Sequence, residues 1–341
     1  MKRRSLPDFA LTLGDPSGIG PEIVAAVLST ASRSLRRRLI VTGSSLALEE
    51  AYSIIQKPLP NFLHPQDRDG NGVRLLDTRE YGHFIPGSIT AQAGAAALAA
   101  ISAAHRLCMD GTCAGMITSP IGKKAIRLAG SPYSGHTDML CGLVRDSLSS
   151  GETHPAPAAE GATRMAMVYR DFRVVMTTLH VAWRDVPGLL TEEAVYETLR
   201  LAHETYATRK NPHPAIAVAG LNPHAGEDGL FGDEEECAIK PAIQRFRTIN
   251  PCVEGPFPAD SLYKKDMRKR FAVFVAQTHD QGLIAIKAEG GIRCVNVTLG
   301  LPYIRTSVGH GTAYDIAGKG VADPGGLKAA IREAFRLARE D

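Results

Sequence analysis

Residues 10–22 read ALTLGDPSGIGPE, a short apolar strand followed by a glycine-rich loop and the start of a helix. Pro21 suits the first turn of that helix, where no N–H is needed. The loop glycines permit a tight turn and close approach of the backbone to a ligand. Because the spacing is not that of the dinucleotide fingerprint, a ligand loop and a plain strand-to-helix turn both remain open.

Further apolar runs, typical of strands buried on both faces, occupy Leu39–Gly43, Ala114–Ser119, Arg173–Thr178 and Ala215–Leu221. Longer helical patterns alternate with them. Ser88–Leu107 is Ala-rich with apolar spacing, Thr191 is the expected N-cap of a helix that begins with Glu192 and Glu193, and a terminal helix is expected from Gly326. The alternation predicts an α/β fold.

The composition is that of an ordinary globular protein of one large or two smaller domains: 341 residues, 44% hydrophobic and 22% charged. A formal charge of +3, with no basic run interleaved with aromatics, argues against nucleic-acid binding. The apolar stretch after the basic start MKRRS is interrupted at Asp15 and Pro16, so it is too short for a signal peptide or a membrane span. A cytoplasmic protein without membrane contact is therefore expected.

Two further expectations come from composition. The six cysteines are scattered, so reduced and mostly buried thiols are expected rather than a zinc site. The polar segment from Ser147 to Thr163 is rich in Ser, Pro, Ala and Gly, which predicts a mobile surface loop.

Three histidines follow apolar runs: His180 after VVMTTL, His224 in GLNPHAGEDG and His279 after FAVFVAQT. Ligands of open α/β sheets collect at the carboxyl ends of strands, so these imidazoles could converge on a divalent metal with open positions for substrate oxygen. Asp260 or Asp280 could orient a ligand or hold a water. Taken singly, each histidine is more often a packed or hydrogen-bonded residue that binds nothing, and it is their common position after apolar runs that favours a metal site.

A second polar loop, SVGHGTAYDIAGKGVADPGG, covers Ser307–Gly326. It could supply backbone donors, a carboxylate for a ribose and a ring to face adenine, although a solvated surface loop has the same composition.

Anion-binding side chains form a third group. Lys287, Asn296 and Arg305 lie close to apolar stretches, and together they could bind a phosphate or carboxylate by charge-assisted hydrogen bonds. His136 and Thr137, in SGHTDML, would add hydrogen-bond donors to the same ligand.

With these motifs assembled, the sequence resembles the 4-hydroxythreonine-4-phosphate dehydrogenase family of pyridoxal phosphate synthesis over essentially its whole length. The resemblance rests on GDPSGIGPE (14–22), SGHTDML (134–140), LNPHAGEDGLFGDEE (221–235), GPFPADSLY (255–263), THDQGL (278–283) and VNVTLGLPYIRTSVGHGTA (295–313). The segment from His310 to Pro324 is also similar to the adenosine-binding loop of the isocitrate and isopropylmalate dehydrogenases, and GDPSGIGPE to their GDGIGPE.

The resemblance implies two α/β/α domains of the isocitrate/isopropylmalate dehydrogenase type with the active site in the cleft between them. A cofactor domain would comprise residues 1–125 and 290–341, and a metal-binding and dimerisation domain residues 126–289. It also implies a homodimer in which the second subunit completes each active site.

The same resemblance assigns roles to single residues. The metal ligands would be His180, His224 and His279, and the substrate contacts His136, Thr137, Lys287, Asn296 and Arg305. The cofactor contacts would be Gly14, Asp15, Gly18, Gly20, His310, Gly311, Thr312 and Asp315. The proton acceptor stays open among His136, Lys123 and a water held by Asp260 or Asp280.

The implied activity is oxidation of 4-phosphooxy-L-threonine by NAD or NADP with a divalent metal (Zn, Mg, Mn or Co), followed by decarboxylation to 3-amino-2-oxopropyl phosphate. Two departures from the family pattern, Gly309 before His310 and a longer Ser147–Thr163 segment, leave the substrate open. Alternatives are 4-phospho-D-threonate or 4-phospho-D-erythronate and an aromatic cis-dihydrodiol, although Lys287, Asn296 and Arg305 favour a phosphate. A non-catalytic sugar-phosphate-binding protein and a metal-dependent hydrolase are the rivals of another class.

Overall fold

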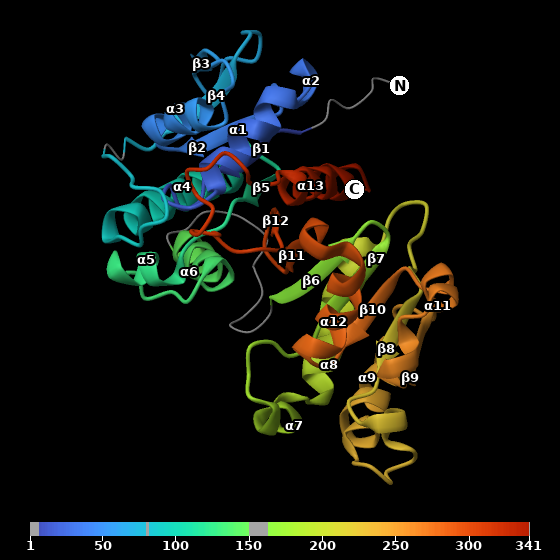
Figure 1. The fold of residues 1–341 in the computed structure, drawn as a ribbon. Coiled ribbons are helices and arrows are strands. Elements are labelled where there is room, and N and C mark those ends of the chain that lie inside the picture. The colour runs from blue at the N-terminus through green and yellow to red at the C-terminus, as the bar shows by residue number, and fades with distance from the viewer. Residues whose placement is uncertain (1–6, 80–81, 150–162, 341) are drawn as a thin grey trace. The chain divides into compact units, whose positions relative to one another are not determined.

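The computed structural model describes residues 7–79, 82–149 and 163–340, which form two compact units (Figure 1). Unit 1 comprises the described residues up to 149 together with 301–339, and unit 2 comprises residues 163–300. Most of the loop predicted at Ser147–Thr163 lies outside the described residues. Each unit is an α/β structure built on consecutive strands of the strand order, so the predicted fold class is confirmed.

Unit 1 is built on a sheet whose strands all pair in parallel, in the order β3 (Phe62–Leu63), β4 (Val73–Asp77), β2 (Leu39–Gly43), β1 (Phe9–Thr12), β5 (Gly115–Thr118) and β12 (Ile304–Val308). Its helices are α1 (Gly20–Thr30), α2 (Arg33–Arg36), α3 (Ser45–Ile54), α4 (Ala91–Met109), α5 (Lys123–Leu128), α6 (His136–Ser149) and α13 (Gly325–Glu340).

Helices cover both faces of this sheet because successive strand residues point to opposite sides. Ala10 belongs to an apolar cluster that contains Ile101 of α4 and Leu140 of α6. The next residue towards the N-terminus, Phe9, packs edge-on against Phe335 of α13 on the other face, with ring centroids 4.8 Å apart. Unit 1 is therefore a three-layer α/β/α sandwich.

Unit 2 contains a mixed sheet in the order β11 (Val295–Leu299), β6 (Arg164–Tyr169), β7 (Phe172–Met176), β10 (Val273–Ala276), β8 (Ile216–Ala219) and β9 (Val253–Phe257). β6 is antiparallel to both of its neighbours, and the other pairs are parallel. The helices are α7 (Val186–Leu189), α8 (Glu192–Tyr206), α9 (Lys240–Phe246), α10 (Ala259–Leu262), α11 (Lys265–Arg270) and α12 (His279–Gly290), with short helices η1 (Trp183–Asp185), η2 (Pro223–Gly226), η3 (Glu235–Ile239) and η4 (Gly291–Arg293).

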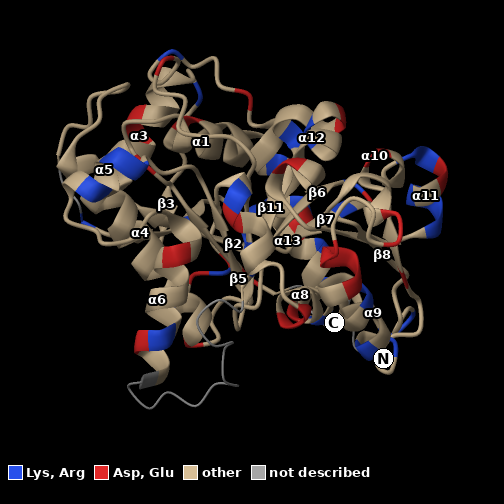
Figure 2. Ribbon diagram, turned by 90° about the horizontal axis from the view of Figure 1, so that it is seen from below, with Lys and Arg blue, Asp and Glu red and all other residues tan. Residues whose placement is uncertain are grey.

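The core of unit 2 also has two sides. Val174 and Met176 of β7 contribute to an apolar cluster with Leu283 and Ile286 of α12. α8 and α9 pack against each other and against the sheet. Figure 2 shows basic and acidic segments interspersed on the helices, with both signs on α11. Among the described residues, none of the helices combines the length and the apolar character needed to cross a membrane.

The compact units divide the chain differently from the expected boundaries at 125/126 and 289/290. The whole of α6 belongs to unit 1 because Met139, Leu140 and Val144 pack against α4. β11 belongs to unit 2 because all five of its residues pair with β6.

Local sequence signals located the elements well. The expected strand at Leu39–Gly43 is β2, and the expected N-cap Thr191 accepts a hydrogen bond from the Ala194 amide. All six cysteines are free, as expected. Cys237 and Cys252 are exposed, so the expectation of mostly buried thiols is only half right; both lie in polar segments outside the strands.

We expect Tyr263→Phe to raise the free energy of unfolding by about 1 kcal/mol. The Tyr263 hydroxyl is buried without a hydrogen-bond partner among the described residues, while its ring packs against Phe172 and Phe274. Removing an unsatisfied hydroxyl relieves a desolvation cost. Urea unfolding measures the change. Tyr52→Phe is the matched control and should lower stability, because Tyr52 shares a side-chain hydrogen bond with Ser29.

His105 makes the stability of unit 1 depend on pH. It is 4% exposed, and its ring nitrogens lie 2.9 Å from the Tyr303 hydroxyl and 3.0 Å from that of Ser147. Burial, with a smaller contribution from Arg106, lowers the pKa of His105 to about 4. The unfolded chain therefore takes up the proton first, and stability falls as the pH drops from about 6.5 to about 4.

We expect this histidine to account for a loss of about 1–3 kcal/mol between pH 7 and pH 4. His105→Gln should flatten the dependence of unfolding free energy on pH in that window. The exposed His64→Gln should leave the slope of the parent protein unchanged. Identical slopes for all three proteins would contradict the assignment.

Candidate active site

Two of the three predicted metal ligands come together in unit 2. His180 follows β7 and His279 follows β10, and these strands are adjacent and parallel, with Met176 opposite Ala276. Their carboxyl ends therefore deliver both imidazoles to one edge of the sheet, where the ring centroids lie 5.5 Å apart.

Asp280 fixes the orientation of the His279 ring. Its Oδ1 lies 2.7 Å from His279 Nδ1, which leaves Nε2 available to a ligand. Thr278 caps α12 in a reciprocal capping box with Gln281. His279 and Asp280 are thus the first two residues of a helix whose first turn is fixed by the reciprocal hydrogen bonds between Thr278 and Gln281.

His180 adopts a left-handed backbone conformation, with φ of 47°. Such a conformation is uncommon for a residue with a side chain and is concentrated at functional sites. His180, His279 and Asp280 line a surface pocket together with Leu179, Trp183 and Val186. The sole tryptophan of the chain, Trp183, is 62% exposed beside the histidine pair.

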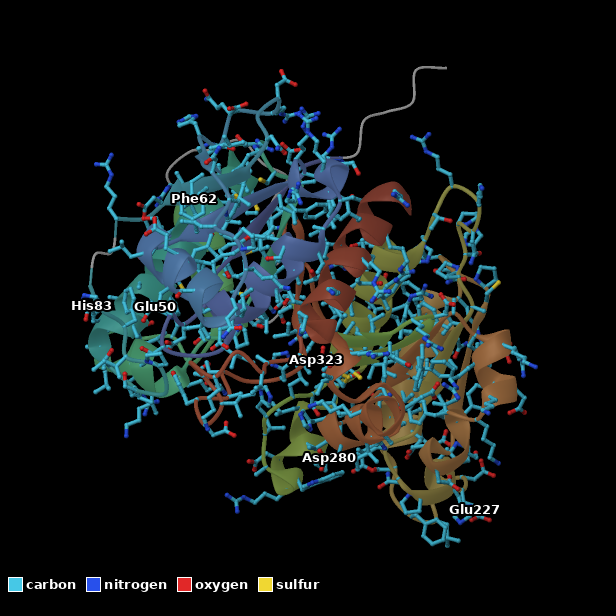
Figure 3. The ribbon with its side chains drawn as sticks, turned by 45° about the horizontal axis from the view of Figure 1, so that its top comes forward. Glu50, Phe62, His83, Glu227, Asp280 and Asp323 are labelled. Atoms are coloured by element: carbon cyan, nitrogen blue, oxygen red, sulfur yellow. The ribbon has the colours of Figure 1, made fainter. Side chains whose placement is uncertain are left out.

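His224 does not join this pair within the chain. Among the residues that the structure describes, no three His, Cys, Asp or Glu side chains are grouped closely enough to hold a metal. The His224 ring lies instead beside Phe231, at 6.1 Å between centroids. Figure 3 shows Glu227, from the His224 loop, well apart from Asp280.

The His224 loop has a defined and strained shape. Residues 224–228 all have positive φ, between 44° and 79°. The buried Glu235 carboxylate accepts hydrogen bonds from the amides of Leu221 and Asn222, at 2.7 and 2.8 Å. Sequence reasoning missed Glu235 because it lies in an acidic run, DEEE, that resembles a solvated surface.

Gln281 ties the same loop to the histidine pair's helix. Its amide group donates to the carbonyls of Gly220 and Leu221, while its oxygen accepts from the amides of Gln277 and Thr278. The THDQGL motif contained this signal, since Gln at the third helical position is the capping-box residue.

The other predicted residues of unit 2 are separate features. Lys287 is exposed on the last turn of α12, and Asp260 is exposed in the first turn of α10. Asn296 of β11 donates to the Met165 sulfur, and its Oδ1 is buried without a hydrogen-bond partner among the described residues.

Unit 1 brings His136 and Arg305 together. Arg305 is 2% exposed and donates to the Thr118 hydroxyl at 2.9 Å. Burial lowers the pKa of Arg305 to about 10. Burial, and secondarily the charge of Arg305, lowers the pKa of His136 well below its usual value, so its imidazole is neutral at physiological pH. The buried His136 Nε2 has no hydrogen-bond partner among the described residues.

His136 and Thr137 are the first two residues of α6, and Lys123 is the first residue of α5. The Lys123 side chain reaches the loop before α6, where its Cε lies 3.9 Å from the position of a Cβ on Gly135. An arginine, a neutral imidazole and a helix N-terminus make this part of unit 1 suited to an anionic ligand.

The two loops predicted to bind the cofactor lie against each other in unit 1. The Ile19 amide donates to the Thr312 carbonyl at 3.0 Å, and a Cβ on Gly18 would lie 3.0 Å from Thr312, a tight contact. Gly14 and Gly20 are similarly close to the backbone of Pro120 and Leu13. Gly14 and Gly20 are therefore required by the local packing of the backbone.

Part of the second loop remains open. Gly311 is exposed, with no atom within 4 Å of the position that a Cβ would occupy, and Asp315 is exposed. His310 Nδ1 lies 3.0 Å from the Gly311 carbonyl. Backbone and carboxylate groups of this loop are accessible to a nucleotide, which fits the predicted cofactor.

The chain matches one sequence family and closely similar proteins over nearly its whole length. Residues 34–334 match the family described as "Pyridoxal phosphate biosynthetic protein PdxA". A 4-hydroxythreonine-4-phosphate dehydrogenase of Geobacter metallireducens is 38% identical and covers 98% of this chain and 96% of its own. The corresponding protein of Beijerinckia indica is 40% identical, covering 96% and 94%.

A crystal structure of a 4-hydroxythreonine-4-phosphate dehydrogenase from Klebsiella pneumoniae is 32% identical and covers 100% of both chains, with a TM-score of 0.85.

Proposed function

The chain belongs to the PdxA family of pyridoxal phosphate biosynthetic proteins, and we propose that it oxidises 4-phosphooxy-L-threonine to 3-amino-2-oxopropyl phosphate and carbon dioxide, with NAD or NADP as the oxidant. The observation that carries this proposal is the His180–His279 pair, which unit 2 holds open at the carboxyl ends of two adjacent parallel strands. A binding protein for sugar phosphates has no need of such a pair.

We assign the divalent cation to His180 and His279 of one chain and His224 of a second copy. The donor set fits, since His279 presents Nε2 while Asp280 holds Nδ1. His224 lies on an exposed loop that also carries Leu230, 71% exposed, and Phe231, 46% exposed, which are suited to a protein partner. A homodimer with shared active sites explains why the triad is incomplete within one chain.

When bound, the cation would polarise the substrate hydroxyl, and the nicotinamide would accept the hydride. The chain's own contribution is binding and proton transfer. We assign Arg305 and Lys287 to the phosphate, and His136, Thr137 and Asn296 to the other polar groups of the substrate.

The hydroxyl proton requires an acceptor. Of the candidates, Asp280 is engaged with His279, and Asp260 is exposed in α10. We favour His136, whose neutral imidazole has a buried Nε2 without a partner among the described residues. Lys123 is the alternative.

The test follows NADH or NADPH formation by absorbance with 4-phosphooxy-L-threonine, 4-phosphothreonate and 4-phosphoerythronate, each with zinc, magnesium and manganese in parallel. Preference for the amino acid supports the proposal, and preference for a phosphorylated sugar acid would replace its substrate. Turnover of none of them would overturn the dehydrogenase assignment; release of inorganic phosphate without NAD(P)H would instead indicate a hydrolase.

A further inference from the structure

Two acidic side chains of the GDPSGIGPE segment hold the loop between β12 and α13. Glu22, in the first turn of α1 and 3% exposed, accepts hydrogen bonds from the amides of Gly318 at 2.6 Å and Gly320 at 2.9 Å. Asp15, fully buried, accepts from the Tyr314 hydroxyl at 2.6 Å. We call these three hydrogen bonds the carboxylate latch. Figure 1 shows the loop, in red, running past the start of α1.

Besides the latch, the loop is held by the Ile19 amide at the Thr312 carbonyl and by turn hydrogen bonds of its own, from the Ile316 amide to the Ala313 carbonyl and from the Lys319 amide to the Ile316 carbonyl. Gly318, Lys319 and Gly320 are exposed, and both glycines have positive φ, of 81° and 67°. An exposed glycine-rich segment loses much conformational entropy when it is fixed, so fixing it requires strong contacts. Hydrogen bonds to a buried carboxylate are about twice as strong as neutral ones, and one Glu22 carboxylate makes two of them.

The oxygens of Asp15 are occupied by the chain itself. Oδ2 accepts a hydrogen bond from the Tyr314 hydroxyl, and Oδ1 accepts one from the Ser17 amide at 2.9 Å. Burial raises the pKa of Asp15, and the hydrogen bonds oppose that rise. Asp15 is thus placed to shape the loop.

We infer that Glu22 and Asp15 are positioning residues that hold loop 312–320 in the conformation that binds the nicotinamide nucleotide. This inference rests on the proposed dehydrogenase function. Glu22 acts at a distance from the reacting atoms, through the amides of Gly318 and Gly320.

The test is Glu22→Gln, which leaves one oxygen and turns an N–H₂ group towards one of the two amides. We expect hydrogen–deuterium exchange of residues 313–321 to accelerate about tenfold, and the Kd for the reduced nucleotide to rise about tenfold, from the loss of one charge-assisted bond. The kcat and the KM for the phosphorylated substrate should stay within about twofold of the parent values. Glu50→Gln, an exposed carboxylate of α3 (Figure 3), is the matched control and should change none of these quantities.

Tyr314→Phe removes the hydrogen bonds of the Tyr314 hydroxyl with Asp15 and with the Thr312 side chain but keeps both Glu22 contacts, and it should give a smaller change in the same direction. It tests the latch even if Glu22→Gln does not fold. Unchanged exchange and Kd in the folded variants would overturn the latch. A parent protein that binds neither NADH nor NADPH would overturn the proposed function instead, and faster exchange in Glu22→Gln would then still confirm the structural half of the inference.

Discussion

Replacing His279 with alanine is expected to lower kcat/KM by about 10³-fold or more and to abolish tight zinc binding. The cation that this side chain would hold would contribute several kcal/mol of transition-state stabilisation. Each loss of about 1.4 kcal/mol lowers the rate tenfold. Zinc content after dialysis and steady-state NAD(P)H formation measure the two effects.

Two controls sharpen this experiment. Asp280→Asn keeps both imidazoles but alters the partner of His279 Nδ1, so a loss of about 10–100-fold is expected. His213→Ala should have no effect, because His213 is exposed and precedes β8, at the opposite end of that strand from the site. Full turnover by His279→Ala would exclude a metal-dependent reaction at this pair.

Mixing two inactive variants, His180→Ala and His224→Ala, is expected to restore about a quarter of the parent activity. If each site takes His180 and His279 from one chain and His224 from the other, a mixed dimer has one site that lacks two ligands and one intact site. Random exchange makes half of the dimers mixed, so about one site in four is complete.

The arrangement within one chain makes the opposite prediction. If all three ligands came from the same chain, every site in a mixed dimer would lack one histidine and the mixture would stay inactive. Mixing His180→Ala with His279→Ala is the internal control, because both residues belong to the same half of the proposed site; this mixture should remain inactive under either arrangement.

The fold was predictable to the extent that local patterns decide it. Apolar runs located β2, β5, β7 and β8, and the N-cap at Thr191 was located by its hydroxyl and the acidic residues after it. The domain boundaries were not predictable from local patterns, because they depend on contacts between residues far apart in the sequence. The sequence of residues 136–149 does not indicate that α6 packs on α4, and the sequence of β11 does not indicate that it pairs antiparallel to β6.

The site divides in the same way. Strand ends predicted the approach of His180 and His279, since β7 and β10 are parallel neighbours. The same rule predicted His224 near them, but the described residues of one chain contain no group of three potential metal ligands. Residues 224–228 of that loop all have positive φ, which the strand pattern does not predict. Glu235 and Glu22 were invisible because a buried carboxylate that accepts backbone amides looks, in sequence, like any surface acid.

The discontinuity of unit 1 has a consequence for synthesis. The strands and helices of unit 2 lie between residues 163 and 300, whereas β12 and α13, which complete the sheet and cover Phe9 of unit 1, follow them in the sequence. On the ribosome, the second unit is whole while the first still exposes the edge of β5 and one apolar face. The part of unit 1 that precedes unit 2 in the sequence therefore lacks its neighbouring strand β12 and its covering helix α13 until unit 2 has been synthesised, and a strand edge stays unpaired in that interval.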